Sequence, residues 1–247
     1  MKKTALVTGV SKNIGNAIAR KLVSDGYFVH GTYNTSEKEA LKLKEDIKDI
    51  ELHQVDFIDR KQTLSLIEEL KNVKFDALVN NAGIIIFEAF DKLSYNNWDK
   101  VLEVNLNTPF ILSHGLRNNF NKGSVIVNIA STDGMTGTFA SVSYSASKAA
   151  LINLTKSLGN VLGRRGIRAV AIAPGWVGSG MDSPAVKEAM ANNPLGRNAK
   201  PEEIANVVSF LVSEKASFIN GQTIIVDGGY QNVDPILKKE AETTEKK

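Results

Sequence analysis

A serine, a tyrosine and a lysine between positions 131 and 148 have side chains that together could assist the transfer of a hydride. Tyr144 and Lys148 are four residues apart, so they lie one turn apart on the same face if this segment is a helix. A tyrosine hydroxyl titrates near pH ~10, and a neighbouring ammonium that lowers this pKa by ~3 units contributes ~4 kcal/mol. Ser131 follows an apolar run and could hold a substrate oxygen beside the tyrosine. These residue types predict a site for a ketone or an alcohol, provided that a hydride carrier lies within reach.

A binding site for such a carrier is indicated at the start of the chain. Thr4–Thr8 has the composition of a short buried strand, and a glycine turn from Gly9 to Gly15 leads into an amphipathic helix that continues through Leu22. A strand, a glycine turn and a helix N-terminus form a pocket of backbone N–H groups suited to a pyrophosphate. The glycine spacing departs from the standard dinucleotide fingerprint, so the prediction rests on the place of the turn within this strand–turn–helix unit.

The composition is that of one soluble enzyme domain. The chain has 247 residues, of which 43% are hydrophobic and 23% are charged, and its net charge is only +3. The basic residues form no stripe that would favour nucleic acid as a partner. Because the chain has no cysteine, disulfides, iron–sulfur clusters and thiolate zinc sites are excluded, and we predict no metal site. The apolar run after Met1 stops at Gly9, too short for export or a membrane span, so we expect a cytoplasmic protein with no membrane partner.

Strands and helices alternate along the chain without a break of the kind that separates domains. Seven strands are predicted, at Thr4–Thr8, Phe28–Tyr33, Glu51–Asp56, Ala77–Asn80, Ser124–Ala130, Arg168–Ala173 and Thr223–Val226. Six helices are predicted, at Ile14–Ser24, Glu37–Ile47, Lys61–Leu70, Asn97–Asn118, Tyr144–Leu162 and Pro201–Leu211. The alternation indicates a parallel sheet covered by helices on both faces. We expect one domain over residues 1–230 and a polar tail over 231–247, which is disordered or peripheral from Ile236 onward.

Several short motifs occur in the order found in the short-chain dehydrogenase/reductase family, which the chain resembles from Lys3 to Tyr230. These motifs are Thr8-Gly9 with Gly15, Asn80-Asn81-Ala82-Gly83, Asn105, Ser131, Tyr144-x-x-x-Lys148 and Pro174-Gly175. The resemblance implies an α/β fold with a single-domain Rossmann-type doubly wound parallel sheet of about seven strands. It also implies an NAD(P)-dependent oxidoreductase. The chain is most similar to 3-oxoacyl-acyl-carrier-protein reductases, including at Pro201-Glu202-Glu203-Ile204-Ala205 and Val226-Asp227-Gly228-Gly229.

The resemblance assigns catalytic roles to four residues. Tyr144 resembles the general acid that gives a proton to the carbonyl oxygen, and Lys148 would lower its pKa and bind the nicotinamide ribose. Ser131 would orient the carbonyl, and Asn105 would bend its helix and hold a water in a proton relay from Lys148. The alternatives are a surface tyrosine beside a solvated lysine, a serine that bonds its own turn, and a solvent-facing asparagine.

The resemblance also implies the cofactor. No acidic residue follows the second predicted strand before Glu37, Tyr33 stands where NAD-preferring relatives carry aspartate, and Lys12 stands where NADP-preferring relatives place a basic residue. A cation near a 2′-phosphate favours NADP(H) over NAD(H), unless Lys12 merely points into water. Asp56 resembles the residue that bonds the adenine amino group. The expected cofactor contacts are Gly9, Ser11, Lys12, Asn13, Ile14, Gly15, Tyr33, Asn34, Thr35, Asp56, Phe57, Asn81, Ala82, Gly83, Tyr144, Lys148, Pro174, Gly175, Val177 and Ser179.

Two positions depart from the family pattern. Asn13 replaces the middle glycine of the first motif, and asparagine tolerates a positive φ better than most residues, so the turn can survive. Ser179 stands where relatives often carry threonine against the nicotinamide amide, and the hydroxyl is kept.

The substrate is less clearly indicated. The expected pocket residues are Ser131, Asp133, Met135, Phe139, Tyr144, Trp176 and Met181, a mostly apolar set with one carboxylate. The resemblance favours a carrier-bound 3-oxoacyl chain, with a small ketone, a sugar or polyol, or a polyketide-like ring as alternatives. Arg164, Arg165 and Arg168 could form a patch for an acidic acyl carrier protein. A non-catalytic NADP-binding scaffold or sensor is a further alternative. The resemblance to the family also implies a homotetramer.

Overall fold

A parallel sheet of seven strands organises the computed structural model, which describes residues 2–178 and 193–244. The strands are β1 (Lys3–Val7), β2 (Tyr27–Tyr33), β3 (Ile50–Gln54), β4 (Phe75–Asn80), β5 (Phe120–Ile129), β6 (Arg168–Pro174) and β7 (Thr223–Val226). Their order in the sheet is β3-β2-β1-β4-β5-β6-β7, and every neighbouring pair is parallel. This order is that of a doubly wound sheet: β2 and β3 are added on one side of β1, and β4 to β7 are added on its other side. The predicted fold class is confirmed.

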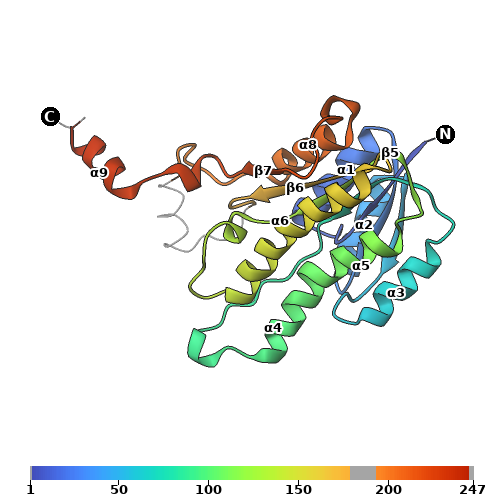
Figure 1. The fold of residues 1–247 in the computed structure, drawn as a ribbon, viewed down its shortest axis with the longest axis horizontal. Coiled ribbons are helices and arrows are strands. Elements are labelled where there is room, and N and C mark those ends of the chain that lie inside the picture. The colour runs from blue at the N-terminus through green and yellow to red at the C-terminus, as the bar shows by residue number, and fades with distance from the viewer. Residues whose placement is uncertain (1, 179–192, 245–247) are drawn as a thin grey trace.

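Helices cover both faces of the sheet. On one face α1 (Asn13–Ser24), α2 (Glu37–Asp46) and α8 (Pro201–Val212) pack over a core that includes Ile18, Leu43 and Val208. On the other face α3 (Arg60–Glu69), α5 (Thr108–Gly115) and α6 (Val142–Gly163) pack over a second core that includes Leu66, Leu112 and Leu158. Figure 1 shows α1 and α8 together on one side of the sheet, with α5 and α6 on the other. Because both faces are covered, the central strands are apolar almost throughout.

The helix predicted at Asn97–Asn118 is divided into three parts. It consists of α4 (Tyr95–Leu102), a π-helical segment η2 (Glu103–Asn107) and α5, which ends at Gly115. The widened turn surrounds Asn105, whose side chain is fully buried and bonded outside its own helix. The helix is thus irregular around Asn105, and the predicted C-terminal end at Asn118 is wrong by three residues.

The C-terminal tail carries a helix that composition did not predict. Helix α9 (Pro235–Thr244) is mostly exposed, and Figure 1 shows it projecting away from the sheet and its covering helices. Its peripheral place agrees with the expectation, and its charged residues explain why it does not join the core. In the described ranges, no helix is long and apolar enough to cross a membrane.

Candidate active site

The glycine turn between β1 and α1 is shaped for close approach of a ligand to its backbone. Gly9 has φ +74°, and a Cβ at Gly15 would lie 2.0 Å from the carbonyl oxygen of Gly9, so no side chain fits there. Asn13 has φ +49°, the single positive φ at a non-glycine residue among those described. Asparagine therefore adopts the left-handed conformation as expected. The turn leaves the N-terminus of α1 open toward the carboxyl ends of the strands, a place that favours a pyrophosphate.

Asn81 fastens this turn to the end of β4. Its Nδ2 donates to the carbonyl oxygens of Thr8 and Gly9 at 2.9 and 3.1 Å, and its backbone N–H donates to the Thr8 hydroxyl at 2.9 Å. The ends of β1 and β4 are thus linked where the strand order changes side, which is the place where doubly wound sheets bind ligands.

A cleft of about 410 Å³ follows the carboxyl ends of β1, β2, β3 and β4. All the expected cofactor residues from the first half of the chain line it, namely Gly9, Ser11, Lys12, Asn13, Ile14, Gly15, Tyr33, Asn34, Thr35, Asp56, Phe57, Asn81, Ala82 and Gly83. The sequence interpretation missed Thr32, Ser36, Val55, Ile58, Ile84 and Val104, which also line the cleft. Most of these are direct neighbours of expected residues, so following each strand one residue further would have found them. The shape, the glycine cradle and the cation of Lys12 fit a dinucleotide.

A second cavity, of about 330 Å³, continues from this cleft and holds the predicted chemical groups. Ser131, Tyr144 and Lys148 line it, as do the expected cofactor residues Pro174, Gly175 and Val177. The two cavities share Ile14, Asn81, Gly83 and Ile84 in their walls. A dinucleotide that lies along the cleft would therefore present one end to Tyr144.

The Tyr144 side chain is half-buried and lines this cavity together with Ser131. Burial raises the pKa of Tyr144, the hydrogen bond with Ser131 lowers this pKa, and the carboxylate of Asp133 raises it. The sequence predicted a pKa lowered by Lys148, whereas the pKa of Tyr144 is raised in this structure; the Lys148 ammonium donates to the backbone oxygen of Ile129 at 2.7 Å. Burial lowers the pKa of Lys148 itself to about 8. Tyr144 is thus held as a neutral proton donor at pH 7.

Asn105 connects three segments around this cavity. Its Oδ1 accepts from the N–H of Ile84 at 2.8 Å, and its Nδ2 donates to the Ile84 carbonyl oxygen at 2.9 Å and to the Ser147 hydroxyl at 3.1 Å. A Cβ at Gly83 would lie 3.3 Å from Asn105 Oδ1 and 3.5 Å from Lys148 Nζ. The widened turn of η2 therefore brings an amide close to the ammonium, as π-helical turns often do at functional sites.

The substrate side of the cavity contains only part of the expected set. Asp133 and Trp176 line it, and burial raises the pKa of the Asp133 carboxyl. Met135 and Phe139 do not line it, and Phe139 is fully exposed on the loop before α6. Ser179 and Met181 lie outside the described residues. Ile85 and Phe87 line the cavity instead; the apolar run after Gly83 was the available signal.

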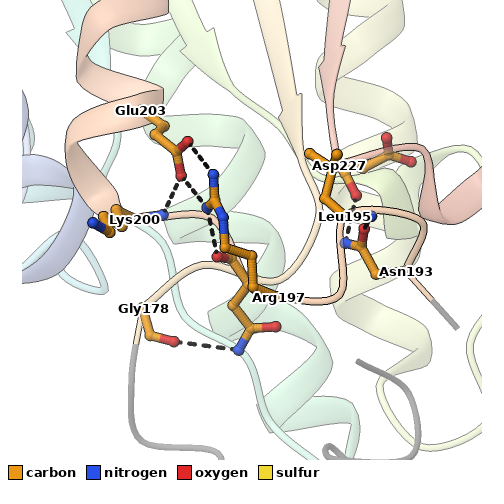
Figure 2. A network of polar contacts seen from close by, with 8 residues as sticks. Gly178, Asn193, Leu195, Arg197, Lys200, Glu203 and Asp227 are labelled. Carbon is orange, nitrogen blue, oxygen red and sulfur yellow. Dashed lines mark hydrogen bonds and ion pairs between the residues drawn. The ribbon is translucent and has the colours of Figure 1, made fainter. Parts of the chain in front are cut away.

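Hydrogen bonds anchor the chain on both sides of residues 179–192 (Figure 2). Asn198 donates to the carbonyl oxygen of Gly178 at 3.3 Å, and Asn193 donates to that of Asp227 at 3.1 Å. Arg197 donates two hydrogen bonds of 2.7 Å to Glu203, and this contact, with the Lys200 N–H, lowers the pKa of Glu203 to about 2. These contacts hold Gly178 and the described residues from Asn193 to Glu203 in place.

Of the three arginines considered for carrier docking, Arg164 and Arg165 are exposed and Arg168 is half-buried. Arg168 donates to the carbonyl oxygens of Leu211 and Ile219 at 2.7 and 3.1 Å, and Arg165 donates to that of Arg117 at 2.8 Å. Arg168 also begins β6, whereas Pro174 at the other end of this strand lines the cavity. Arg165 and Arg168 thus donate to carbonyls at the end of the sheet remote from Tyr144.

Comparisons with known proteins agree with this geometry. The family model described as Enoyl-(Acyl carrier protein) reductase matches residues 9–231. The 3-oxoacyl-[acyl-carrier-protein] reductase FabG of Aquifex aeolicus (strain VF5) is 40% identical over 240 residues, which cover 92% of this chain and 96% of the relative. The acetoacetyl-CoA reductase of Acinetobacter sp. (strain RA3849) is 36% identical over 241 residues, with coverage of 92% and 97%.

A solved structure is similar along most of the chain. A short-chain dehydrogenase from Burkholderia cenocepacia J2315 in complex with NADP has a TM-score of 0.88 and 31% identity, covering 93% of this chain and 98% of that one. The relatives and the site together establish the reaction class. The chain belongs to the short-chain dehydrogenase/reductase family, most similar to 3-oxoacyl-acyl-carrier-protein reductases, and is an NAD(P)-dependent oxidoreductase acting on CH–OH or ketone groups.

Proposed function

We propose that this protein is an NADPH-dependent reductase that converts a 3-oxoacyl thioester, carried by acyl carrier protein, into the 3-hydroxyacyl thioester. The observation that carries the proposal is the presence of Tyr144, Ser131 and Lys148 together in a cavity continuous with the dinucleotide cleft. A binding-only protein has no need of a proton donor at that place. The alternatives, reduction of a small ketone, sugar or polyol and a non-catalytic scaffold, are outcomes of the experiment below.

The residues of the cavity divide the chemistry between them. NADPH, when bound, supplies the hydride that adds to the carbonyl carbon. Tyr144 donates the hydroxyl proton to the carbonyl oxygen, so the C=O bond becomes a secondary alcohol and the tyrosine is left as a phenolate. Ser131 donates a hydrogen bond to the same oxygen and orients it. Lys148 and Asn105 lie next to this centre, where an ammonium favours the transient phenolate and helps its return to the neutral form.

The charges of the cleft support NADPH as the preferred cofactor. Lys12 lines the cleft, and in the described part of the chain no acidic side chain forms an ion pair with it. Tyr33, Asn34, Thr35 and Ser36 line the wall after β2, where an acidic residue would repel a 2′-phosphate. A lysine with neighbouring hydroxyl and amide donors favours the additional phosphate of NADP(H). The NADP complex of the Burkholderia relative supports the same choice.

The walls of the substrate cavity support an acyl chain as the substrate. Ile84, Ile85, Phe87 and Trp176 provide apolar surface beside Ser131. Such surface stabilises an alkyl chain through the hydrophobic effect but offers few partners for sugar hydroxyls. The names of the Aquifex and Acinetobacter relatives point to 3-oxoacyl thioesters on a carrier protein and on coenzyme A. The homotetramer and the cytoplasmic location remain predictions.

The test is the loss of NADPH absorbance, with NADH in parallel, against a panel of ketones. The panel contains acetoacetyl thioesters on acyl carrier protein and on coenzyme A, free diketones, and a keto sugar. We expect turnover with NADPH and the highest kcat/KM with the carrier-bound thioester. Turnover with a free ketone alone would exclude the thioester while keeping the mechanism, and tight NADPH binding without turnover across the panel would favour the scaffold.

A further inference from the structure

Two buried histidines and a glutamate meet on the side of the sheet that α3 covers, away from the catalytic cavity. His30 lies on β2, and Glu51 and His53 lie on β3, the edge strand of the sheet. His30 and Glu51 are direct partners in the strand register, and residues two apart in a strand point to the same face. His30 and His53, which are 23 positions apart in sequence, are thus brought together on one face of the sheet.

The ligand atoms of these three residues lie close enough together to surround one metal ion. His30 Nδ1 lies 3.1 Å from His53 Nε2 and 3.7 Å from Glu51 Oε2, and the three potential ligand atoms all lie within 4.8 Å of one another. Because zinc–nitrogen bonds are about 2.0–2.1 Å long, two nitrogens at a tetrahedral angle lie about 3.3 Å apart. The three atoms are therefore spaced closely enough to share one small cation.

A fourth residue prepares His53 for this role. Glu69, on α3, lies 2.9 Å from His53 Nδ1, so this nitrogen carries the proton and His53 Nε2 keeps its lone pair facing His30. Carboxylates that accept from the far nitrogen of a metal-binding histidine orient the ring and increase its basicity. A hydrogen bond between the two imidazoles would explain the contact between His30 and His53. It would not explain why Glu51 lies beside His30 and Glu69 beside His53.

The surroundings provide both rigidity and access. The His30 ring packs edge-on against Phe28 and Phe75, with ring centres 5.4 and 5.8 Å apart, which fixes its orientation. The side chains of His30 and His53 are 8% and 3% exposed, while that of Glu51 is 54% exposed. An ion can therefore enter from solvent beside Glu51.

We propose that His30, Glu51 and His53 bind one Zn²⁺ ion, or a divalent first-row ion of similar preference, with a water as the fourth ligand and Glu69 as the support of His53. Imidazole nitrogens select such ions over Mg²⁺ and Ca²⁺, and the two carboxylates balance the charge of the ion. The expectation of no metal rested largely on the missing cysteines, and a site of distant histidines gives no spacing motif in the sequence.

The ion would link β2 to β3 through its ligands. Tyr33 follows His30 by three residues and Asp56 follows His53 by three residues, and both line the cofactor cleft. The bound ion would therefore stabilise the edge of the sheet that carries the adenosine end of the cleft. The site contains none of the residues that surround Tyr144. The ion therefore contributes stability and no step of the reaction.

The experiment is a titration of the untagged, chelator-stripped full chain with ZnCl₂, followed by calorimetry and by the melting temperature. We expect one equivalent per chain and a higher Tm with zinc. Co²⁺ should give the visible absorption bands of a tetrahedral site. His53→Gln and Glu51→Gln should each weaken binding at least tenfold, and Glu69→Gln about 10- to 100-fold. His114→Gln, which changes the only other histidine and is exposed on α5, is the matched control.

Glu51 is exposed, so its variant should fold even if the histidine variants do not; far-UV circular dichroism and NADPH binding check this. Loss of stoichiometric zinc in Glu51→Gln, with binding retained in His114→Gln, would support the site. Weak binding that does not saturate at one equivalent, or binding unchanged in both Glu51→Gln and His53→Gln, would overturn it.

Discussion

The ammonium of Lys148 donates to the backbone carbonyl oxygen of Ile129 at 2.7 Å and lies 5.5 Å from the centre of the Tyr144 ring. Lys148 is buried at the wall of the second cavity, which also holds Tyr144. Among the described residues, no acidic side chain forms an ion pair with it. Burial removes water from the Lys148 ammonium and so disfavours its charged form, which lowers the pKa of Lys148 to about 8. The placement suits a group that binds a ribose and assists a phenolate, and it reduces the stability of the fold.

Replacement of Lys148 should therefore separate stability from activity. The pKa shift from 10.5 to about 8 corresponds to a cost of about 3 kcal/mol at pH 7, partly offset by the bond to Ile129. We expect Lys148→Met to raise the free energy of unfolding by about 1 kcal/mol at pH 7 and to abolish reduction. Urea unfolding at pH 7 measures this, with Lys156→Met on the exposed side of α6 as the control.

The same pKa shift predicts how stability changes with pH. Between pH 8 and 10.5 the unfolded chain keeps the Lys148 proton while the folded chain loses it, so the stability of the wild type rises with pH in this window. The advantage of Lys148→Met should accordingly shrink from pH 7 to pH 9.5. A difference between the two proteins that stays constant over this range would contradict the buried cation.

Cofactor preference should depend on Lys12. A charged hydrogen bond to a phosphate contributes about 1.5–3 kcal/mol, so Lys12→Ala should lower kcat/KM for NADPH about tenfold or more. The value for NADH, which lacks the 2′-phosphate, should change little. Steady-state rates with both cofactors measure the effect, and Lys38→Ala on α2, outside the cleft lining, is the control. Equal losses with NADPH and NADH would mean that Lys12 does not contact the 2′-phosphate.

Gly15 should tolerate no side chain. A Cβ at this position would lie 2.0 Å from the Gly9 carbonyl oxygen and 2.5 Å from Asn81 Nδ2, so Gly15→Ala must displace the turn. We expect a loss of about 2–3 kcal/mol in stability and a loss of NADPH affinity, measured by thermal unfolding and by fluorescence titration. Gly163→Ala, whose Cβ would meet its nearest neighbour at 3.4 Å, should leave both quantities unchanged.

Asn13 should be replaceable by glycine but not by alanine. At φ +49° alanine is strained by about 1 kcal/mol, while glycine adopts this conformation freely. Asn13→Gly should therefore keep the stability and the NADPH affinity of the wild type, and Asn13→Ala should lose stability. If Asn13→Gly lost NADPH affinity while its stability was unchanged, the asparagine side chain itself would be a cofactor contact.

The sequence predicted those parts of the site that depend on short segments. Gly9, Gly15 and the strand–helix alternation are local, and the spacing of Tyr144 and Lys148 places both on one helix face, so these predictions agree with the structure. The pKa of Tyr144 was predicted in the wrong direction because burial and the bond from Lys148 to Ile129 depend on tertiary packing.

Other features required contacts between distant segments. Phe87 lies in an apolar run that is typical of a buried core, yet it is exposed at the cavity wall. Arg168 has the charge of a docking residue, but its donors satisfy carbonyls at Leu211 and Ile219. Such partners are far apart along the chain, and no periodicity in the sequence records them.

The most direct test of the central claim is the single-turnover rate of NADPH oxidation by Tyr144→Phe with acetoacetyl-acyl-carrier-protein. Loss of the proton donor should slow the reaction by about 10²- to 10⁴-fold while NADPH still binds. Tyr95→Phe, which changes an exposed tyrosine at the start of α4, should react like the wild type. A Tyr144→Phe protein that reduces the thioester at the wild-type rate would contradict the assignment of Tyr144 as the general acid.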